Sequence, residues 1–232
     1  MNKKRIIIII VAIVVVLVAA IAVLIGLNPG KEEEKKHKVI FLNPDGTIFE
    51  TEECPTDSWP PSPGIPPVPE GNIFGGWNTE GFSNESDVTV RPILIPVPQD
   101  ANVVALSYGY GLSGDEISLP LILGGKVELC CFEAEITYDP EVLEFVGFSQ
   151  EDGAFVGNCI EEEGKILVNY ISSNNTTGSV DLSNIDFKIK DTSKEVTNLS
   201  VAVKTAAKAL EGEKLEVVTC KTIDAEVKIG RR

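Results

Sequence analysis

The sequence has very few of the residues that carry out most enzyme chemistry. It contains one histidine, His37, which falls in a charged segment ahead of the region expected to fold. Nucleophilic catalysis by serine or cysteine needs an adjacent base, most often histidine, so no dyad or triad can be assembled. Acidic residues are numerous, but none lies in a recognisable motif for hydrolysis by paired carboxylates. The sequence therefore predicts a protein that is not an enzyme.

Patterns that bind metal ions or phosphate are also missing. The five cysteines include no CxxC pair and no zinc-ligand spacing. Adjacent Cys130 and Cys131 are expected on opposite faces of a strand; a bridge between two of the others would form only outside the cell, and the sequence does not choose the pair. "DGTIFETEE" lacks the ligand positions of an EF-hand loop, and "GYGLSG" lacks the Lys-Ser/Thr of a phosphate loop. We expect no cofactor and no metal in this chain.

Positive charge is scarce too. Twenty basic residues stand against 35 acidic ones, which gives a formal net charge of −15. Such a chain is repelled by phosphate backbones, so we expect no nucleic-acid partner. The balance predicts a soluble acidic surface, and a patch for a basic or metal-bearing partner is the alternative interpretation.

The N-terminus carries the one long hydrophobic run. Residues 6–27 are uncharged and almost wholly aliphatic, long enough for a helix to span a bilayer. Lys3, Lys4 and Arg5 precede it, which places that end in the cytoplasm and exports the rest. We therefore predict an N-terminal transmembrane signal anchor over residues 1–30, a charged linker over 31–38 and a location on the bacterial cell surface. A signal peptide cleaved near Ala20-Ile21-Ala22 is the alternative and would give a secreted protein.

A small module is predicted over residues 39–95. "KVIFLNPDGTIFETEEC" reads as two strands around Asp45-Gly46, a strong hairpin signal, and the Pro-rich passage that follows excludes a regular helix. With "FGGW" at Phe74–Trp77 and "FSNESDVTV" at Phe82–Val90, this layout resembles the internalin B-repeat (Listeria–Bacteroides repeat). The resemblance implies a small β-grasp-like fold that serves as a spacer or adhesive module. Trp77 is expected in its core, with a ligand platform as the alternative.

After a linker over residues 96–102, the segment 103–230 changes to many short strands separated by turn residues. This regular spacing predicts a β-sandwich, so the chain is expected to be mainly β. In "CFEAEITY" alternation places Phe132, Ala134, Ile136 and Tyr138 on one face and the intervening residues on the other. Asp139 and Pro140 then predict a capped turn before the next strand, "LEFVGF".

The order of these features resembles a cohesin domain. The matching pieces are "GDEISLPLIL", "FEAEITYDPEVLEFVGF", "GKILVNYISS", "LSNIDFKIK" and a closing strand near "DAEVKIG". The resemblance implies a jelly-roll β-sandwich that binds dockerin-bearing proteins, whether enzymes or scaffold subunits. Any calcium would lie in the dockerin, whose paired loops bind it, and not in this chain.

The resemblance also implies a contact surface on an exposed sheet face formed by three strands. Glu133 stands where the family often has a polar contact residue, and Tyr170 would be the apolar anchor. The implied partner-binding residues are Cys131, Glu133, Glu135, Val168, Tyr170, Ser172, Asn184, Asp186 and Lys188.

These observations predict a non-catalytic, membrane-tethered anchoring scaffold of the kind found in cellulosome-type assemblies. The first alternative is a carbohydrate-binding or adhesin sandwich. Sugar binding usually needs exposed aromatic side chains, yet Trp59 and Trp77 fall outside the predicted sandwich, which leaves Tyr108, Tyr110 and Tyr170. A purely structural stalk without a partner is the third interpretation.

Overall fold

The computed structural model describes residues 35–56, 58–79, 86–98, 100–125, 128–150, 156–176, 178–212 and 214–230. The predicted membrane anchor at residues 6–27 lies outside these residues. Within the described ranges, no helix is long and apolar enough to cross a membrane. Residues Lys36–Arg232 form one compact unit.

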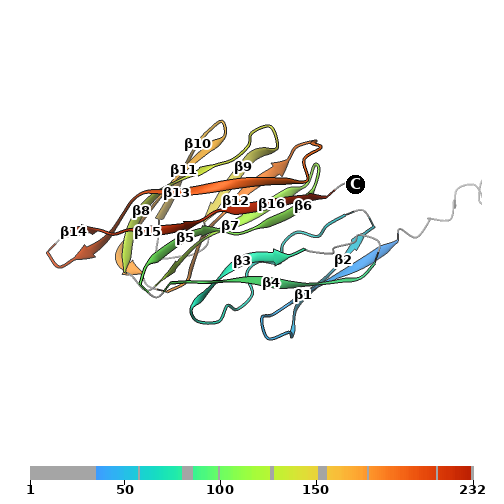
Figure 1. The fold of residues 1–232 in the computed structure, drawn as a ribbon, viewed down its shortest axis with the longest axis horizontal. Helices are drawn as coiled ribbons and strands as arrows, with labels where there is room; N and C mark the ends of the chain where they lie inside the picture. Colours follow the sequence, from blue (N-terminus) through green and yellow to red (C-terminus); the bar gives the residue numbers. More distant parts are fainter. Residues whose placement is uncertain are drawn as a thin grey trace, which may run out of the picture. The chain divides into compact units, whose positions relative to one another are not determined.

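Two sheets form a β-sandwich in the C-terminal part of this unit (Figure 1). The seven-stranded sheet has the order β10-β11-β8-β13-β16-β6, and β14 pairs with β13 off this path. Its strands are β6 (Gly109–Leu112), β8 (Leu129–Thr137), β10 (Val156–Glu162), β11 (Lys165–Thr176), β13 (Val196–Leu210), β14 (Lys214–Val217) and β16 (Ala225–Gly230). The predicted mainly β sandwich is thereby confirmed.

The second sheet has five strands in the order β15-β5-β7-β12-β9. They are β5 (Asn102–Leu106), β7 (Glu116–Gly125), β9 (Leu143–Gln150), β12 (Val180–Ile189) and β15 (Cys220–Ile223). Two pairs are parallel, β15 with β5 and β16 with β6, and the other pairs within the two sheets are antiparallel. The core between the sheets is built by alternation, so that Phe132, Ala134 and Ile136 meet Ile185 and Phe187.

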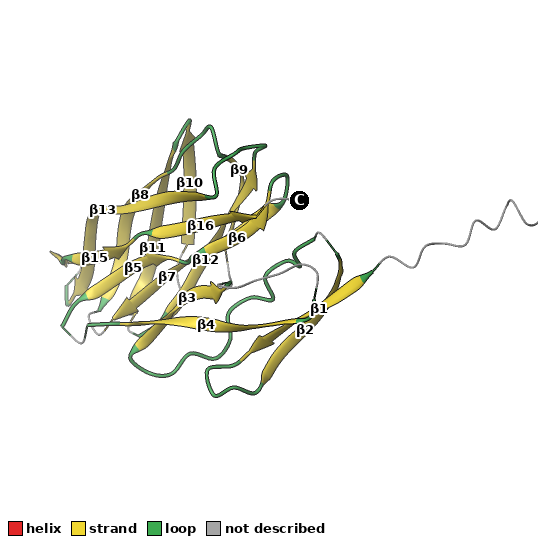
Figure 2. Ribbon diagram, turned by 45° about the vertical axis from the view of Figure 1, so that its right-hand side comes forward, coloured by secondary structure: helices red, strands yellow, loops and turns green. Residues whose placement is uncertain are grey.

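A four-stranded sheet, order β2-β1-β4-β3, precedes the sandwich. Its strands are β1 (Lys36–Leu42), β2 (Ile48–Pro55), β3 (Asn72–Asn78) and β4 (Val88–Pro96), and β1 pairs with β4 in parallel. The Asp45-Gly46 turn is confirmed between β1 and β2, with Gly46 at a φ of 88° and its N–H donating to the carbonyl of Asn43. Figure 2 shows the described chain as strands and loops throughout.

The small sheet covers part of the outer face of the five-stranded sheet. Ile73 and Phe74 of β3 share a buried cluster with Val103 and Ala105 of β5 and Ile122 of β7. Strand β5 is therefore buried along both faces, which accounts for the apolar run from Val103 to Leu106 that follows Asn102. The predicted module and sandwich meet through a shared apolar core.

The sequence predicted His37 in a charged linker, and this prediction is wrong because His37 is buried in β1. Strand β1 begins at Lys36, and alternation within it turns the lysines outward while His37 and Val39 point inward. The ring of His37 is 2% exposed, and its Nε2 lies 3.2 Å from Sγ of Cys54 on the facing strand. Burial raises the pKa of the Cys54 thiol, so the thiol stays protonated where it meets the His37 ring in the small core.

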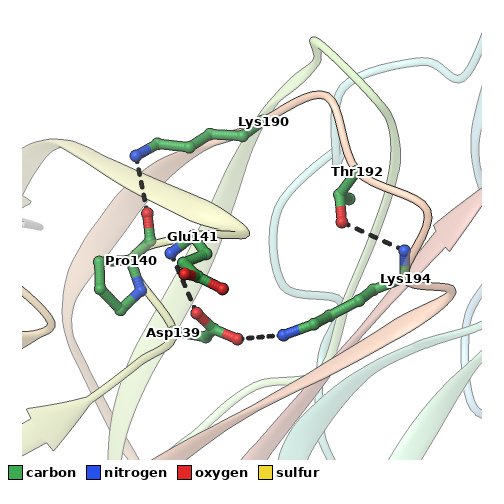
Figure 3. Close-up of polar contacts among 6 residues, drawn as sticks. All are labelled: Asp139, Pro140, Glu141, Lys190, Thr192 and Lys194. Atoms are coloured by element: carbon green, nitrogen blue, oxygen red, sulfur yellow. Dashed lines mark hydrogen bonds and ion pairs between the residues drawn. The ribbon is translucent and has the colours of Figure 1, made fainter.

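The predicted turn after β8 is present and held by side chains (Figure 3). Oδ1 of Asp139 accepts the N–H of Glu141 at 3.0 Å, and the Asp139 carbonyl accepts the N–H of Leu143 at 2.9 Å. Lys194 reaches Oδ2 of Asp139 at 2.5 Å, and Lys190 donates to the carbonyl of Pro140 at 2.7 Å. The chain therefore reverses at a turn tied to the loop that follows β12.

Candidate docking face

The outward face of β10, β11, β8 and β13 is the best candidate for a protein-binding surface, and we call it the docking face. Alternation along β8 turns Cys131, Glu133 and Glu135 to this face and the side chains between them to the core. All three were predicted there, and each is partly exposed. Cys130 and Cys131 point to opposite sides as expected, and all five cysteines are free thiols.

Strand β11 contradicts the prediction by one residue. Val168 and Tyr170 are 0% and 2% exposed and lie in the core, because Val168 pairs with inward-facing Ala134 and Tyr170 with inward-facing Phe132. The side chains that reach the docking face are Leu167, Asn169 and Ile171. Both phases of "KILVNYIS" contain apolar residues, so the alternation did not decide between them. The face of β11 is decided by its pairing with β8, which joins residues far apart in the sequence.

Strand β12 also departs from the prediction. Asn184, Asp186 and Lys188 do point outward, but β12 lies between β7 and β9 in the five-stranded sheet. The predicted site thus combined two opposite faces of the sandwich. Ser172 follows Ile171 and is partly exposed where the regular pairing of β11 with β8 breaks.

A polar row crosses the middle of the docking face. Asn158, Asn169, Glu133 and Thr205 lie directly opposite one another on β10, β11, β8 and β13. Within the described part of the chain, no side chain bonds to the carboxylate of Glu133. A shallow hollow of about 360 Å³ lies over this row. The carboxylate of Glu133 and the amide of Asn169 can form hydrogen bonds with a partner, whereas Oδ1 of Asn158 already accepts the N–H of Cys159.

Apolar side chains flank the polar row on both sides. Ile160 on β10 lies opposite Leu167, and Ile171 lies opposite Cys131. Ile160 is 51% exposed and Ile171 is 61% exposed. Exposed apolar side chains gathered beside polar groups on one sheet face can mark a surface that binds another protein.

At the edge of the docking face, Glu135 forms ion pairs with two lysines. Lys204 of β13 and Lys165 of β11 lie 3.1 Å and 3.8 Å from its two carboxylate oxygens. The hydrogen bond from Lys204, supported by the charge of Lys165, lowers the pKa of Glu135. Glu135 is therefore engaged within the chain, and Glu133 is the carboxylate left for a partner.

The floor of the docking face is held by contacts of Tyr170 in the core. The Tyr170 ring stacks on Phe132 with centroids 4.8 Å apart, and its hydroxyl bonds to the hydroxyl of Ser183 across the core. Gly157 on β10 lies opposite Tyr170, and a methyl group there would come within 3.0 Å of that ring. Sequence reasoning gave Tyr170 the role of an anchor on the surface; the structure gives it the role of a support beneath it.

The fold is a two-sheet β-sandwich whose seven-stranded sheet exposes a polar row flanked by apolar side chains. The family model for the cohesin domain matches residues 110–229, more than half of the chain. The chain belongs to the cohesin domain family. Its matched region includes the docking face and excludes the small sheet.

A solved cohesin structure agrees with this fold, and other solved cohesins are similar at lower TM-scores. The seventh ScaB type I cohesin from Pseudobacteroides cellulosolvens is 18% identical, with a TM-score of 0.51, and the match covers 57% of this chain and 94% of that one. A non-cellulosomal cohesin from the archaeon Archaeoglobus fulgidus is 16% identical, with a TM-score of 0.49 over 56% of this chain and 91% of that one. A type I cohesin–dockerin complex from Clostridium thermocellum is 15% identical, with a TM-score of 0.49 over 56% and 100%. No curated protein matches the chain.

Proposed function

We propose that this protein is a non-catalytic cohesin that captures dockerin-bearing proteins through its docking face. The observation that carries the proposal is the polar row with the unpaired Glu133 at its centre, flanked by exposed Ile160 and Ile171. Such a surface buries apolar side chains while its carboxylate and amides form specific hydrogen bonds. Calcium belongs to the dockerin in this proposal.

The proposed contact set keeps part of the sequence prediction and replaces the rest. Cys131, Glu133 and Glu135 stay on it. Val168 and Tyr170 are replaced by the β11 residues that reach the surface, and the β12 residues are left out because they lie on the other sheet. The set is Cys131, Glu133, Glu135, Asn158, Ile160, Leu167, Asn169, Ile171 and Thr205.

The other parts of the chain serve presentation in this proposal. Residues 6–27 anchor the protein in the membrane, and the folded part displays its docking face at the cell surface. The small sheet acts as a spacer of the internalin B-repeat type. In support, Trp77 packs edge-on against Phe41 and Phe74, with centroids 4.9 Å and 5.4 Å away, as a core residue of a small module would.

The test uses the full chain as bait for the secreted proteins of the same organism, with calcium or with a chelator. We expect retention of dockerin-bearing proteins, identified by mass, only with calcium. A purified dockerin from that set should then bind Glu133→Lys and Ile171→Asp variants about tenfold more weakly or worse. Lys188→Ala is the matched control, because Lys188 is exposed on the opposite sheet.

Two results would contradict the proposal. One is failure to retain any dockerin-bearing protein. The other is dockerin binding that Glu133→Lys and Ile171→Asp leave unchanged, which would place the contact elsewhere on the sandwich.

A further inference from the structure

An aromatic groove lies beside the five-stranded sheet, away from the docking face. Trp59 of the Pro-rich segment and Trp77 of β3 line it together with Tyr108 and Tyr110 of the sandwich. Its volume is about 310 Å³, within the range of sites for small molecules. The sequence had placed both tryptophans outside the sandwich; the fold brings them against it.

The groove is fixed by backbone contacts between the small sheet and the sandwich. The N–H of Tyr108 donates to the carbonyl of Gly75 at 2.7 Å, and the Ser107 hydroxyl donates to the carbonyl of Phe74 at 3.1 Å. Gly76 adopts a φ of 116°, and a methyl group at this position would lie 2.6 Å from the carbonyl oxygen of Tyr108. Figures 1 and 2 show β3 next to the sandwich, where it contacts β7. A ligand would therefore meet a preformed site.

The aromatic rings are held in position but stay partly exposed. Trp59 meets Tyr110 with centroids 4.8 Å apart and an interplanar angle of 64°. Trp77 is fixed by the phenylalanines of the small sheet. All four groove aromatics are half-buried, so each keeps some ring surface for a ligand. Partly exposed, fixed rings of this kind suit stacking against a flat apolar surface.

The polar side of the groove offers mainly hydrogen-bond acceptors. Glu116 and Ser118 of β7 and Asp186 of β12 line it. The Ser118 hydroxyl donates to Oδ1 of Asp186 at 2.6 Å, which fixes that carboxylate. Among the described residues that line the groove there is no lysine or arginine. Two carboxylates on a chain of net charge −15 would repel an anionic ligand.

We propose that this groove binds neutral sugar rings of a polysaccharide. A pyranose ring has a face of C–H groups that can stack on tryptophan and tyrosine, and an edge of hydroxyl groups that can donate to Glu116 and Asp186. The site would operate independently of the docking face, which lies on the other sheet. The protein would then hold a protein partner on one side and a glycan on the other.

A proline-rich peptide is the other ligand that aromatic grooves accept, and the groove suits it less well. Recognition of such peptides relies on side-chain donors for their carbonyl groups, because proline has no N–H. The Nε1 atom of Trp77 is buried and cannot reach a ligand. The chain's own Pro60 and Pro61 already form part of the groove wall.

The test is native affinity electrophoresis of the full chain in gels that contain a soluble β-glucan, a xylan or a galactomannan. We expect at least one of these neutral polysaccharides to retard the protein. Glu116→Ala and Trp59→Ala should each weaken the binding about tenfold. Glu144→Ala is the matched control, an exposed glutamate on β9 outside the groove. Glu116 is itself exposed, so its variant tests the site even where Trp59→Ala disturbs folding.

Retardation by none of the three polysaccharides would overturn the proposal. Equal retardation of the wild type and of Glu116→Ala would overturn it too, as would binding of an oligoproline peptide that Glu116→Ala does not affect. Dockerin binding should be unchanged in Glu116→Ala, and sugar binding should be unchanged in Ile171→Asp. Failure of one proposal would therefore be distinguished from failure of the other.

Discussion

The hydroxyl of Tyr170 in β11 forms a hydrogen bond with the hydroxyl of Ser183 in β12, and so joins the two sheets inside an apolar core. The two residues are 2% and 1% exposed. Burial raises the pKa of the Tyr170 phenol, which therefore stays protonated. Since Tyr170 lies directly under the docking face, this contact couples the shape of that face to the sandwich core.

Tyr170→Phe should destabilise the protein without weakening partner binding. The change leaves the Ser183 hydroxyl buried without its partner, which costs about 1–3 kcal/mol in the free energy of unfolding. Urea denaturation measures the loss. Tyr138→Phe is the matched control, because Tyr138 bonds to the carboxylate of exposed Glu161, which water can replace, so the loss there should be smaller. A large loss of dockerin affinity in Tyr170→Phe, with a folded protein, would instead make Tyr170 a contact residue.

Gly157→Ala should also destabilise the protein. The added methyl group would lie 3.0 Å from the rings of Phe148 and Tyr170, and the Tyr170 ring is held by its stacking and its hydrogen bond. Overpacking of this kind costs about 1–3 kcal/mol. Gly147→Ala is the control, since its methyl group would meet only Oδ2 of Asp186 at 3.7 Å. Equal midpoints of thermal unfolding for Gly157→Ala and Gly147→Ala would contradict this prediction. They would show that the Tyr170 ring moves aside for the added methyl group.

Asp139→Asn should weaken the turn after β8 in a pH-dependent way. The hydrogen bond from Lys194 and that from the N–H of Glu141 lower the pKa of Asp139 below its ordinary value of 3.8. The ionised carboxylate is therefore favoured by folding. The stability that this carboxylate contributes is fully present at pH values above its ordinary pKa of 3.8. It is lost as the pH falls through the lowered pKa of the folded protein.

Asparagine keeps an acceptor for the N–H of Glu141 but loses the charge that pairs with Lys194, so the Asp139→Asn variant should lose less than about 1 kcal/mol at neutral pH and approach the wild type in acid. Urea denaturation across the acid range measures the difference. Asp191→Asn is the control, because it removes a carboxylate from the same loop as Lys194 that forms no ion pair among the described residues. A constant difference between Asp139→Asn and the wild type at every pH would contradict the assigned ion pair.

The Cys159 thiol should react slowly at neutral pH. Burial, and then the charge of Glu161, raise its pKa to about 11 from an ordinary value of 9.0. Folding favours the protonated thiol over the thiolate. The stability that Cys159 contributes in this way is fully present below pH 9.0 and is lost as the pH rises through about 11. Alkylation with iodoacetamide, followed by mass spectrometry, should accelerate at Cys159 only in strong alkali, and at lower pH once urea unfolds the chain. Rapid alkylation of the folded protein at neutral pH would contradict this assignment.

Local sequence rules predicted the parts of the fold that depend on neighbouring residues. Asp45-Gly46 and Asp139-Pro140 form turns where their side chains and backbone preferences placed them. Strand β8 has a clean alternation of apolar and polar residues, and its faces followed directly. The regular spacing of short strands predicted the sandwich, and the family resemblance specified the cohesin type.

Pairings between distant strands could not be read in the same way. Tyr170 went to the wrong face because both phases of β11 are apolar enough to be buried, and only its pairing with β8 decides. Asp186 was assigned to the wrong sheet because alternation shows which side chains share a face but not which strands are neighbours. Trp59 reaches Tyr110 only through the packing of the small sheet, which no local pattern shows.

The parallel pairing of β1 with β4 has a mechanical consequence. The chain enters this pair at the start of β1 and leaves it at the end of β4 toward the sandwich, so tension along the chain would pull the two strands past each other lengthwise. Their hydrogen bonds would then resist together instead of opening one after another. If the protein is held at its N-terminal side and pulled through its sandwich, the force acts along β1 and β4. In this direction all the hydrogen bonds between the two strands must break together.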